Sequence, residues 1–128
     1  MTSPFETSAK PLKSLAGKRV LIVEDEFFVA EEMARDFQTY GAEVVGPVPS
    51  LDAAREALAK GDPLDGAVLD INLLGDRVFP LVDILLRRGV ACVFSTGYDQ
   101  FTLPLAYRSI PLCQKPAATD DIARALFG

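Results

Sequence analysis

Apolar and polar positions along the chain predict strands and helices in alternation. Five nearly continuous apolar runs are typical of strands that are buried on both faces of a parallel sheet. They occupy residues 19–24, 42–48, 64–70, 90–95 and 110–114. Helical periodicity follows four of these runs. It predicts helices over residues 26–40, after Ser50 as far as Gly61, over about 77–88, and from a cap at Thr119 to the end of the chain. The alternation indicates one α/β domain with a doubly wound parallel sheet.

Two prolines predict the order of the strands. Pro47 falls in the second run and Pro111 in the fifth, whereas the other three runs contain no proline. A central strand cannot lose a backbone donor, so these two strands should lie at the edges of the sheet. The flavodoxin-like order 2-1-3-4-5 places them there, and it makes the first and third strands neighbours at a switch point where ligands bind.

The connection between the fourth and fifth strands does not fit a regular helix. Only residues 99–108 are available for it, and Pro104 lies in the middle of them. Proline removes a helical hydrogen bond and clashes with the preceding turn. We therefore expect an irregular fourth helix that is short or distorted.

The start of the chain differs in character from the rest. Residues 1–18 are polar and contain Pro4 and Pro11, which predicts a mobile leader. Residues 19–128 form the predicted domain. The leader has no apolar core of the kind found in signal peptides.

Composition excludes several classes of function. The net charge of −5 disfavours non-specific attraction to nucleic acid or acidic membranes, and no apolar stretch is long enough to span a bilayer. The absence of histidine excludes His–Asp catalytic pairs, histidine zinc sites and a phosphohistidine step in this chain. Cys92 and Cys113 lie in apolar runs without CxxC spacing, so we expect buried free thiols. These features predict a cytoplasmic protein with no nucleic-acid partner and no membrane insertion.

Acidic residues end two of the predicted strands. Glu24 and Asp25 follow the first run, and Asp70 ends the third. If the two strands are neighbours, the three carboxylates meet at one edge of the sheet and need a counter-charge. An all-oxygen cluster favours Mg²⁺ or Mn²⁺, with Asp25 and Asp70 as direct ligands, Glu24 acting through water, and the carbonyl of Asn72 completing the site.

Further polar residues end the fourth and fifth strands. Carboxylates can form aspartyl-phosphates, which makes Asp70 the best candidate nucleophile. Lys115 could reach one phosphoryl oxygen, and the hydroxyl of Thr96 could donate to another. Phosphoryl transfer depends mainly on positioning and charge neutralisation, and this set could supply both.

Together these residues resemble the phosphoacceptor site of response-regulator receiver domains, which have the CheY-like fold. The shared positions are Glu24-Asp25, Asp70, Thr96 and Lys115-Pro116, in the family's order, and the resemblance covers residues 19–127. It implies a two-component phosphorelay protein that is not an enzyme. Asp70 would receive a phosphoryl group, in the presence of Mg²⁺, from a sensor histidine kinase, a phosphotransfer protein or a small phosphodonor.

A second motif is similar to that of a receiver subgroup. Residues 94–98, Phe-Ser-Thr-Gly-Tyr, partly match the Phe-Ala-Thr-Gly-hydrophobic-Tyr motif of alphaproteobacterial receivers that are often single domains. Typical receivers carry an aromatic residue three positions before the lysine, where this chain has Leu112. We therefore expect Tyr98 or the 97–108 segment to carry the switch instead.

Three other kinds of protein fit the sequence less well than a receiver. A metal-dependent phosphatase with an aspartyl nucleophile would place an acidic residue where this chain has Asn72, which cannot transfer protons. A dinucleotide-binding domain needs a glycine-rich turn after the first strand, and residues 24–26 are acidic instead. An interaction scaffold that is never phosphorylated would not need the acidic set.

The predicted output is binding to a downstream protein, or drainage of phosphate from a kinase. The sequence ends directly after the last helix, so we expect no attached effector. The expected partner face comprises the 97–108 segment, the fifth strand and the last helix.

Overall fold

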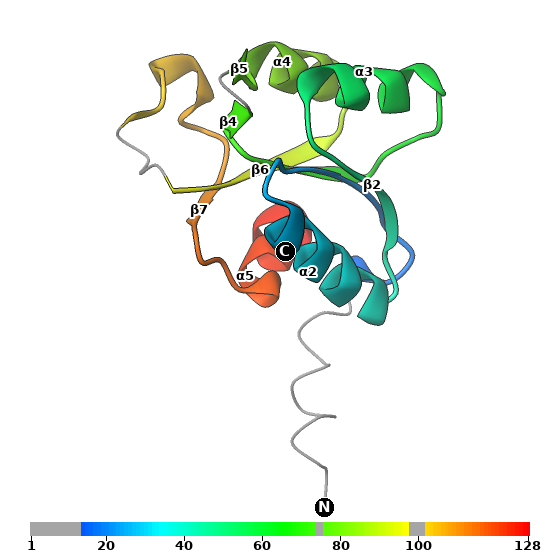
Figure 1. Ribbon diagram of the computed structural model, residues 1–128. Coiled ribbons are helices and arrows are strands. Elements are labelled where there is room, and N and C mark those ends of the chain that lie inside the picture. Colours follow the sequence, from blue (N-terminus) through cyan, green and yellow to red (C-terminus); the bar gives the residue numbers. More distant parts are fainter. Residues whose placement is uncertain (1–13, 74–75, 98–101) are drawn as a thin grey trace, which may run out of the picture.

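A five-stranded parallel sheet forms the centre of the molecule. The computed structural model describes residues 14–73, 76–97 and 102–128 (Figure 1). The strands of the sheet are β1 (Arg19–Val23), β2 (Glu43–Val48), β3 (Gly66–Leu69), β6 (Ala91–Thr96) and β7 (Leu112–Gln114). Their spatial order is β2-β1-β3-β6-β7, and each neighbouring pair is parallel. This is the predicted flavodoxin-like order, with β1 and β3 side by side.

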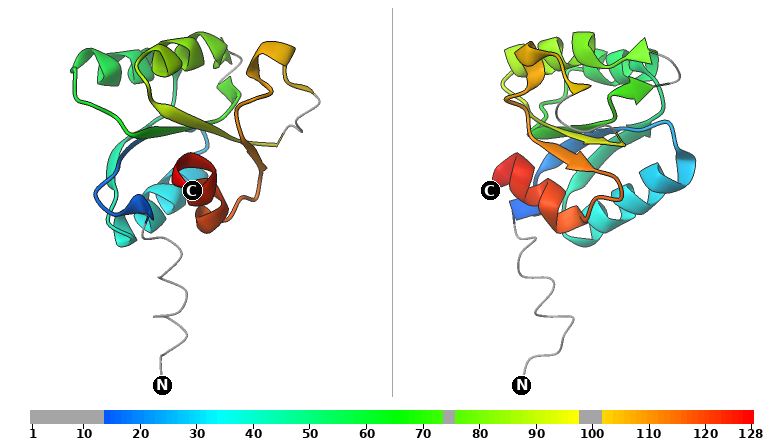
Figure 2. Two further views of the ribbon diagram at one scale, coloured as in Figure 1. Left: turned by 180° about the vertical axis from the view of Figure 1, so that it is seen from behind. Right: turned by 90° about the vertical axis from the view of Figure 1, so that its left-hand side faces the viewer.

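Helices cover both faces of the sheet (Figures 1 and 2). On one face lie α2 (Phe27–Thr39) and α5 (Thr119–Phe127), and on the other lie α3 (Leu51–Ala59) and α4 (Phe79–Arg87). Two core clusters result, one under each helix pair. Phe37 is the largest fully buried side chain of the α2–α5 cluster, and Phe94 is the largest of the α3–α4 cluster. Apolar side chains point alternately to the two faces along each buried strand, so both clusters are anchored on the same strands.

The second and fifth strands are the edges of the sheet, as predicted from their prolines. Pro47 lies within β2, but Pro111 precedes β7 rather than lying inside it, because that strand begins at Leu112. Gly46 has a φ of 92°, which favours glycine, and a Cβ atom at this position would lie 2.7 Å from the backbone nitrogen of Val48. Glycine therefore allows β2 its irregular pairing with β1 between Leu21 and Val23.

The two predicted helix caps have different outcomes. The hydroxyl of Ser50 accepts a hydrogen bond from the backbone N–H of Ala53 at 3.1 Å, which confirms the cap of α3. The cap predicted at Thr119 is wrong. Ala118 takes the capping position of α5, and the Thr119 hydroxyl donates instead to an oxygen of Asp36 on α2, at 3.0 Å. Thr119 thus ties two helices together.

Two loops differ from regular α/β connections. After β3 the chain forms a small antiparallel pair that the sequence did not predict, β4 (Asn72–Leu73) and β5 (Asp76–Arg77). Between β6 and β7 the described residues include the short 3₁₀ helix η3 (Leu105–Tyr107) and form no α-helix. The irregular character predicted for this connection is therefore confirmed for residues 102–108.

The packed part of the chain begins earlier than predicted. Leu15 is fully buried in the α2–α5 cluster, and the backbone N–H of Gly17 donates to the carbonyl of Gly41 at 2.9 Å. The boundary at residue 19 was therefore placed too late, because one leucine in a polar segment gives no periodic signal. The rest of the predicted leader, residues 1–13, lies outside the described residues. In the segments that are described, no helix combines the length and apolar character needed to span a bilayer.

Candidate functional site

The carboxylates of Glu24, Asp25 and Asp70 meet at the carboxyl edge of the sheet. Glu24 follows β1 and Asp70 follows β3, and the backbone N–H of Asp70 donates to the carbonyl of Val23 at 3.0 Å. This pairing of neighbouring strands sets the two acidic positions side by side. One oxygen from each of the three carboxylates lies within 4.8 Å of the others. The structure thus brings together the three acidic residues that the sequence singled out.

The ammonium of Lys115 lies between two of these carboxylates. Its Nζ is 2.9 Å from Oε1 of Glu24 and 2.9 Å from Oδ2 of Asp70. Lys115 follows β7, the strand beside β6, and its backbone N–H donates to the carbonyl of Thr96 at 2.8 Å. Residues from four strand ends therefore reach one site, although they lie up to 91 positions apart in the sequence.

Burial makes the electrostatics of this site stronger than those of a surface ion pair. The exposed fraction is 2% for the Glu24 side chain, 10% for Asp70 and 18% for Lys115. Desolvation raises the pKa of Glu24 above its usual value, although Lys115 opposes the shift. Burial by itself lowers the pKa of Lys115, but hydrogen bonds to Asp70 and Glu24 outweigh this and raise it overall. Lys115 is therefore held as a cation between the carboxylates.

The other predicted site residues differ in how closely they join this group. Thr96 ends β6 and is 1% exposed, and its carbonyl is bonded to Lys115. Asn72 lies at the start of β4 and is exposed, and its backbone N–H lies 3.5 Å from Oδ1 of Asp70. Tyr98, the predicted switch residue, lies outside the described residues.

Sequence reasoning missed Glu26 as a partner of the lysine. Its Oε1 lies 3.7 Å from Nζ of Lys115, and its backbone N–H donates to Oε1 of Glu24 at 3.1 Å. The sequence does contain a signal for Glu26, because this residue directly follows Glu24 and Asp25. The three acidic residues were used only as an argument against pyrophosphate binding. Glu26 is the first of several acidic groups that extend the site along α2.

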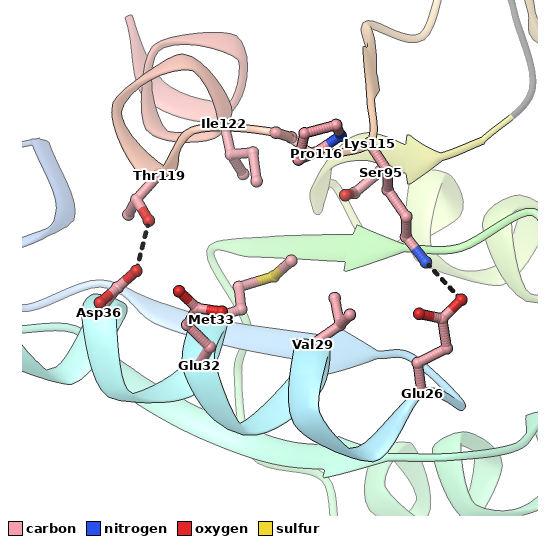
Figure 3. Close-up of a pocket in the computed structure, with 11 residues that line it drawn as sticks. Glu26, Val29, Glu32, Met33, Asp36, Ser95, Lys115, Pro116, Thr119 and Ile122 are labelled. Carbon is pink, nitrogen blue, oxygen red and sulfur yellow. Dashed lines mark hydrogen bonds and ion pairs between the residues drawn. The ribbon is translucent and has the colours of Figure 1, made fainter.

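A groove of about 470 Å³ opens beside Lys115, between α2 and the loop that leads to α5 (Figure 3). Glu26, Glu32 and Asp36 of α2 line one side. Met33 and Ile122 supply apolar walls, and the bond from Thr119 to Asp36 crosses the far end (Figure 3). The site is thus continuous with an acidic groove rather than a closed cavity.

The carboxylate group fits a hard divalent cation by its chemistry. All three side-chain donors are oxygens, and two of them, on Glu24 and Asp70, are buried. Such ions prefer carboxylate and carbonyl oxygens and keep several waters. Because Asp25 is less buried than the other two, the group has an accessible side.

Comparisons with known proteins agree with this geometry. No family model matches the sequence, and no curated protein matches it either. Among solved structures, SdrG from Sphingomonas melonis Fr1 is 30% identical, with a TM-score of 0.71 over 88% of this chain and 94% of that one. The BeF3-activated conformation of SdrG, from Pseudomonas melonis Fr1, is 32% identical, with a TM-score of 0.72 over 87% and 94% of the two chains.

The chain belongs to the response-regulator receiver family. The response regulator PhyR from Brucella abortus is also similar, at 26% identity and a TM-score of 0.75. The match covers 94% of this chain but 52% of PhyR, so this receiver corresponds to about half of that protein. The neighbours of this receiver are signalling proteins of two-component systems, as the sequence resemblance implied.

Proposed function

We propose that this receiver accepts a phosphoryl group on Asp70 in a reaction that requires Mg²⁺ or Mn²⁺. The observation that carries the proposal is the 2.9 Å contact between Nζ of Lys115 and Oδ2 of Asp70, within a cluster of three carboxylates. A carboxylate beside a fixed ammonium can attack phosphorus, while the cation balances the charge that arrives with the phosphoryl group.

The proposed step is a simple displacement. A carboxylate oxygen of Asp70 forms a bond to phosphorus, and the bond from phosphorus to the donor breaks. The electron pair of that bond leaves with the histidine nitrogen of a kinase, or with the oxygen of a small acyl phosphate. Lys115 would turn from the carboxylate to a phosphoryl oxygen, and Thr96 would donate its hydroxyl to another. Both residues stand at adjacent strand ends, which are joined by a 2.8 Å backbone hydrogen bond.

Asp25, Asp70 and the carbonyl of Asn72 would hold the cation directly, with Glu24 acting through water. When bound, the cation would neutralise oxygens of the attacking carboxylate and of the phosphoryl group. Glu24 is already hydrogen-bonded to Lys115 and to the backbone of Glu26. These bonds support a role for Glu24 in orienting the site rather than in direct coordination.

The proposed phosphodonor is a sensor histidine kinase or a phosphotransfer protein in the cytoplasm. Two observations support it: the chain has no histidine for an internal phosphorelay step, and SdrG, at 32% identity, has a BeF3-activated conformation. The proposed output is phosphorylation-dependent binding of a downstream protein, or use as a phosphate sink. We further propose residues 97–108, β7 and α5 as the partner face, with Tyr98 as one switch residue.

The experiment treats purified protein with acetyl phosphate, with and without Mg²⁺, and measures its intact mass. We expect the wild type to gain one phosphoryl group only with the cation, and Asp70→Asn to gain none. Asp65→Asn is a matched control, because Asp65 precedes β3 at the opposite end and binds the backbone N–H of Arg19. A wild type that never gains mass would favour the unphosphorylated scaffold.

A metal-dependent phosphatase is the remaining enzyme alternative. Asn72 occupies the position where such an enzyme would need an acidic group, and an amide cannot transfer protons. An assay with a generic phosphomonoester separates the two functions. Rapid multiple turnover would contradict the receiver proposal, and a stable aspartyl-phosphate would support it.

A further inference from the structure

Tyr107 joins the connection between β6 and β7 to α4. The hydroxyl of Tyr107, in η3, donates to Oδ1 of Asp83 on α4 at 2.9 Å. Its ring stacks on Phe79, also on α4, with ring centroids 4.4 Å apart and an interplanar angle of 19°. Figures 1 and 2 show η3 beside α4, although the two elements are well separated in the sequence.

This contact continues through aromatic rings to the strand that ends at the site. Phe79 meets Phe94 of β6 edge to face, with centroids 6.1 Å apart. Phe94 is fully buried in the α3–α4 cluster, against which Phe79 and Tyr107 also pack. Thr96 lies two residues after Phe94 on the same strand, so the two side chains point to the same face of the sheet. The α4 side of the sheet thus links Thr96 to Tyr107 through two phenylalanines.

The same connection lies between the two residues that we propose to bind the phosphoryl group. It begins after Thr96 and leads into β7, which Lys115 follows. Leu103 is 2% exposed and Ile110 is 6% exposed, so both flanks of η3 are anchored in the core. Leu105, between them, is 79% exposed. A displacement of Thr96 and Lys115 toward a phosphoryl group would therefore be resisted at Tyr107, where the connection is held against α4.

We propose that docking of Tyr107 on Asp83 and Phe79 belongs to the unphosphorylated state, and that phosphorylation of Asp70 releases it. Tyr107 is then a positioning residue for Thr96 and Lys115. Its release from α4 would change the position of η3. The proposal rests on the phosphoacceptor role proposed above. By linkage, a contact made only in the unphosphorylated state must weaken binding of a phosphoryl mimic, and removing the contact must strengthen that binding.

The test is the affinity for beryllofluoride in the presence of Mg²⁺, followed by ¹⁹F and amide NMR. Tyr107→Phe keeps the ring stacked on Phe79 and removes only the hydroxyl. We expect this variant to bind beryllofluoride about threefold to tenfold more tightly, the range for loss of one typical exposed hydrogen bond. Asp83→Ala should give a similar gain. The double variant should add little, because both changes remove the same bond.

Tyr40→Phe is the matched control, since Tyr40 packs against the α2–α5 cluster on the other face of the sheet. A purely structural role for Tyr107 would lower the stability of Tyr107→Phe without tightening the binding. If the wild type binds beryllofluoride but Tyr107→Phe and Asp83→Ala bind it equally well or more weakly, the proposed release of Tyr107 is wrong. The phosphoacceptor role of Asp70 would not be affected by this result. A wild type that does not bind would overturn both proposals.

Discussion

Replacing Lys115 by methionine removes the ammonium from its buried carboxylates and keeps most of the side-chain length. Nζ is 2.9 Å from an oxygen of Glu24 and 2.9 Å from one of Asp70. Each contact has a Coulomb attraction of about 6 kcal/mol at an effective dielectric constant of about 20. Desolvation of the three groups offsets much of this attraction, so the net contribution is far smaller than the sum.

The loss should still exceed that of a surface ion pair, because Glu24 and Asp70 would remain buried together without a counter-charge. Removing one partner of a fully buried pair costs about 3 to 5 kcal/mol. The Lys115 side chain is 18% exposed, so we expect a loss of about 2 to 4 kcal/mol in the free energy of unfolding. Urea unfolding followed by circular dichroism, in buffer with a metal chelator, measures it.

A divalent cation should then replace part of the lost stability. The proposed Mg²⁺ would bind the folded carboxylates, and in the variant it would no longer compete with Lys115. Adding Mg²⁺ should therefore stabilise Lys115→Met more than the wild type. Lys60→Met is the control, because Lys60 is exposed at the end of α3. A loss below about 1 kcal/mol, or equal stabilisation of both proteins by Mg²⁺, would refute the idea that Lys115 compensates the acidic cluster.

Two further predictions test the packing around the sheet. Gly46→Ala should destabilise the protein more than Gly61→Ala in the same urea assay, since both glycines have positive φ but a Cβ at position 46 would meet the nitrogen of Val48. Equal losses would contradict the close approach. Burial raises the pKa of the Cys92 thiol to about 11. Cys113 is more accessible, and its pKa is raised mainly by burial and to a smaller extent by the charge of Asp121. Iodoacetamide at mildly alkaline pH should therefore alkylate Cys113 first, as peptide mass mapping can check, and prior reaction of Cys92 would contradict its burial.

The fold could be predicted because hydrophobic pattern and proline placement point to the same arrangement. Continuous apolar runs marked the buried strands, and the prolines near β2 and β7 marked the edges. The start of the packed chain and the cap of the last helix were predicted incorrectly. Leu15 joins the core from a polar segment, and Thr119 bonds to Asp36 rather than to its own helix. Both depend on tertiary contacts, which no local pattern records.

The acidic site was predictable in its membership but not in all its contacts. The carboxyl ends of all strands in a parallel sheet lie at the same edge. The sequence alone therefore predicted that Glu24, Asp70 and Lys115 lie close together. Glu26 was missed because a third acidic residue in a turn is ordinary at the start of a helix. The contact of Tyr107 with Asp83 joins positions 24 residues apart across an irregular connection, and periodicity says nothing about such pairs.

The location of the phosphoryl group tests the central claim most directly. After reaction with acetyl phosphate and Mg²⁺, reduction with borohydride converts an aspartyl-phosphate to homoserine, and peptide mass spectrometry identifies the position. We predict homoserine at position 70 alone, and none when Mg²⁺ is omitted. Homoserine at any other aspartate, or an unmodified Asp70 in protein that has gained phosphoryl mass, would contradict the account.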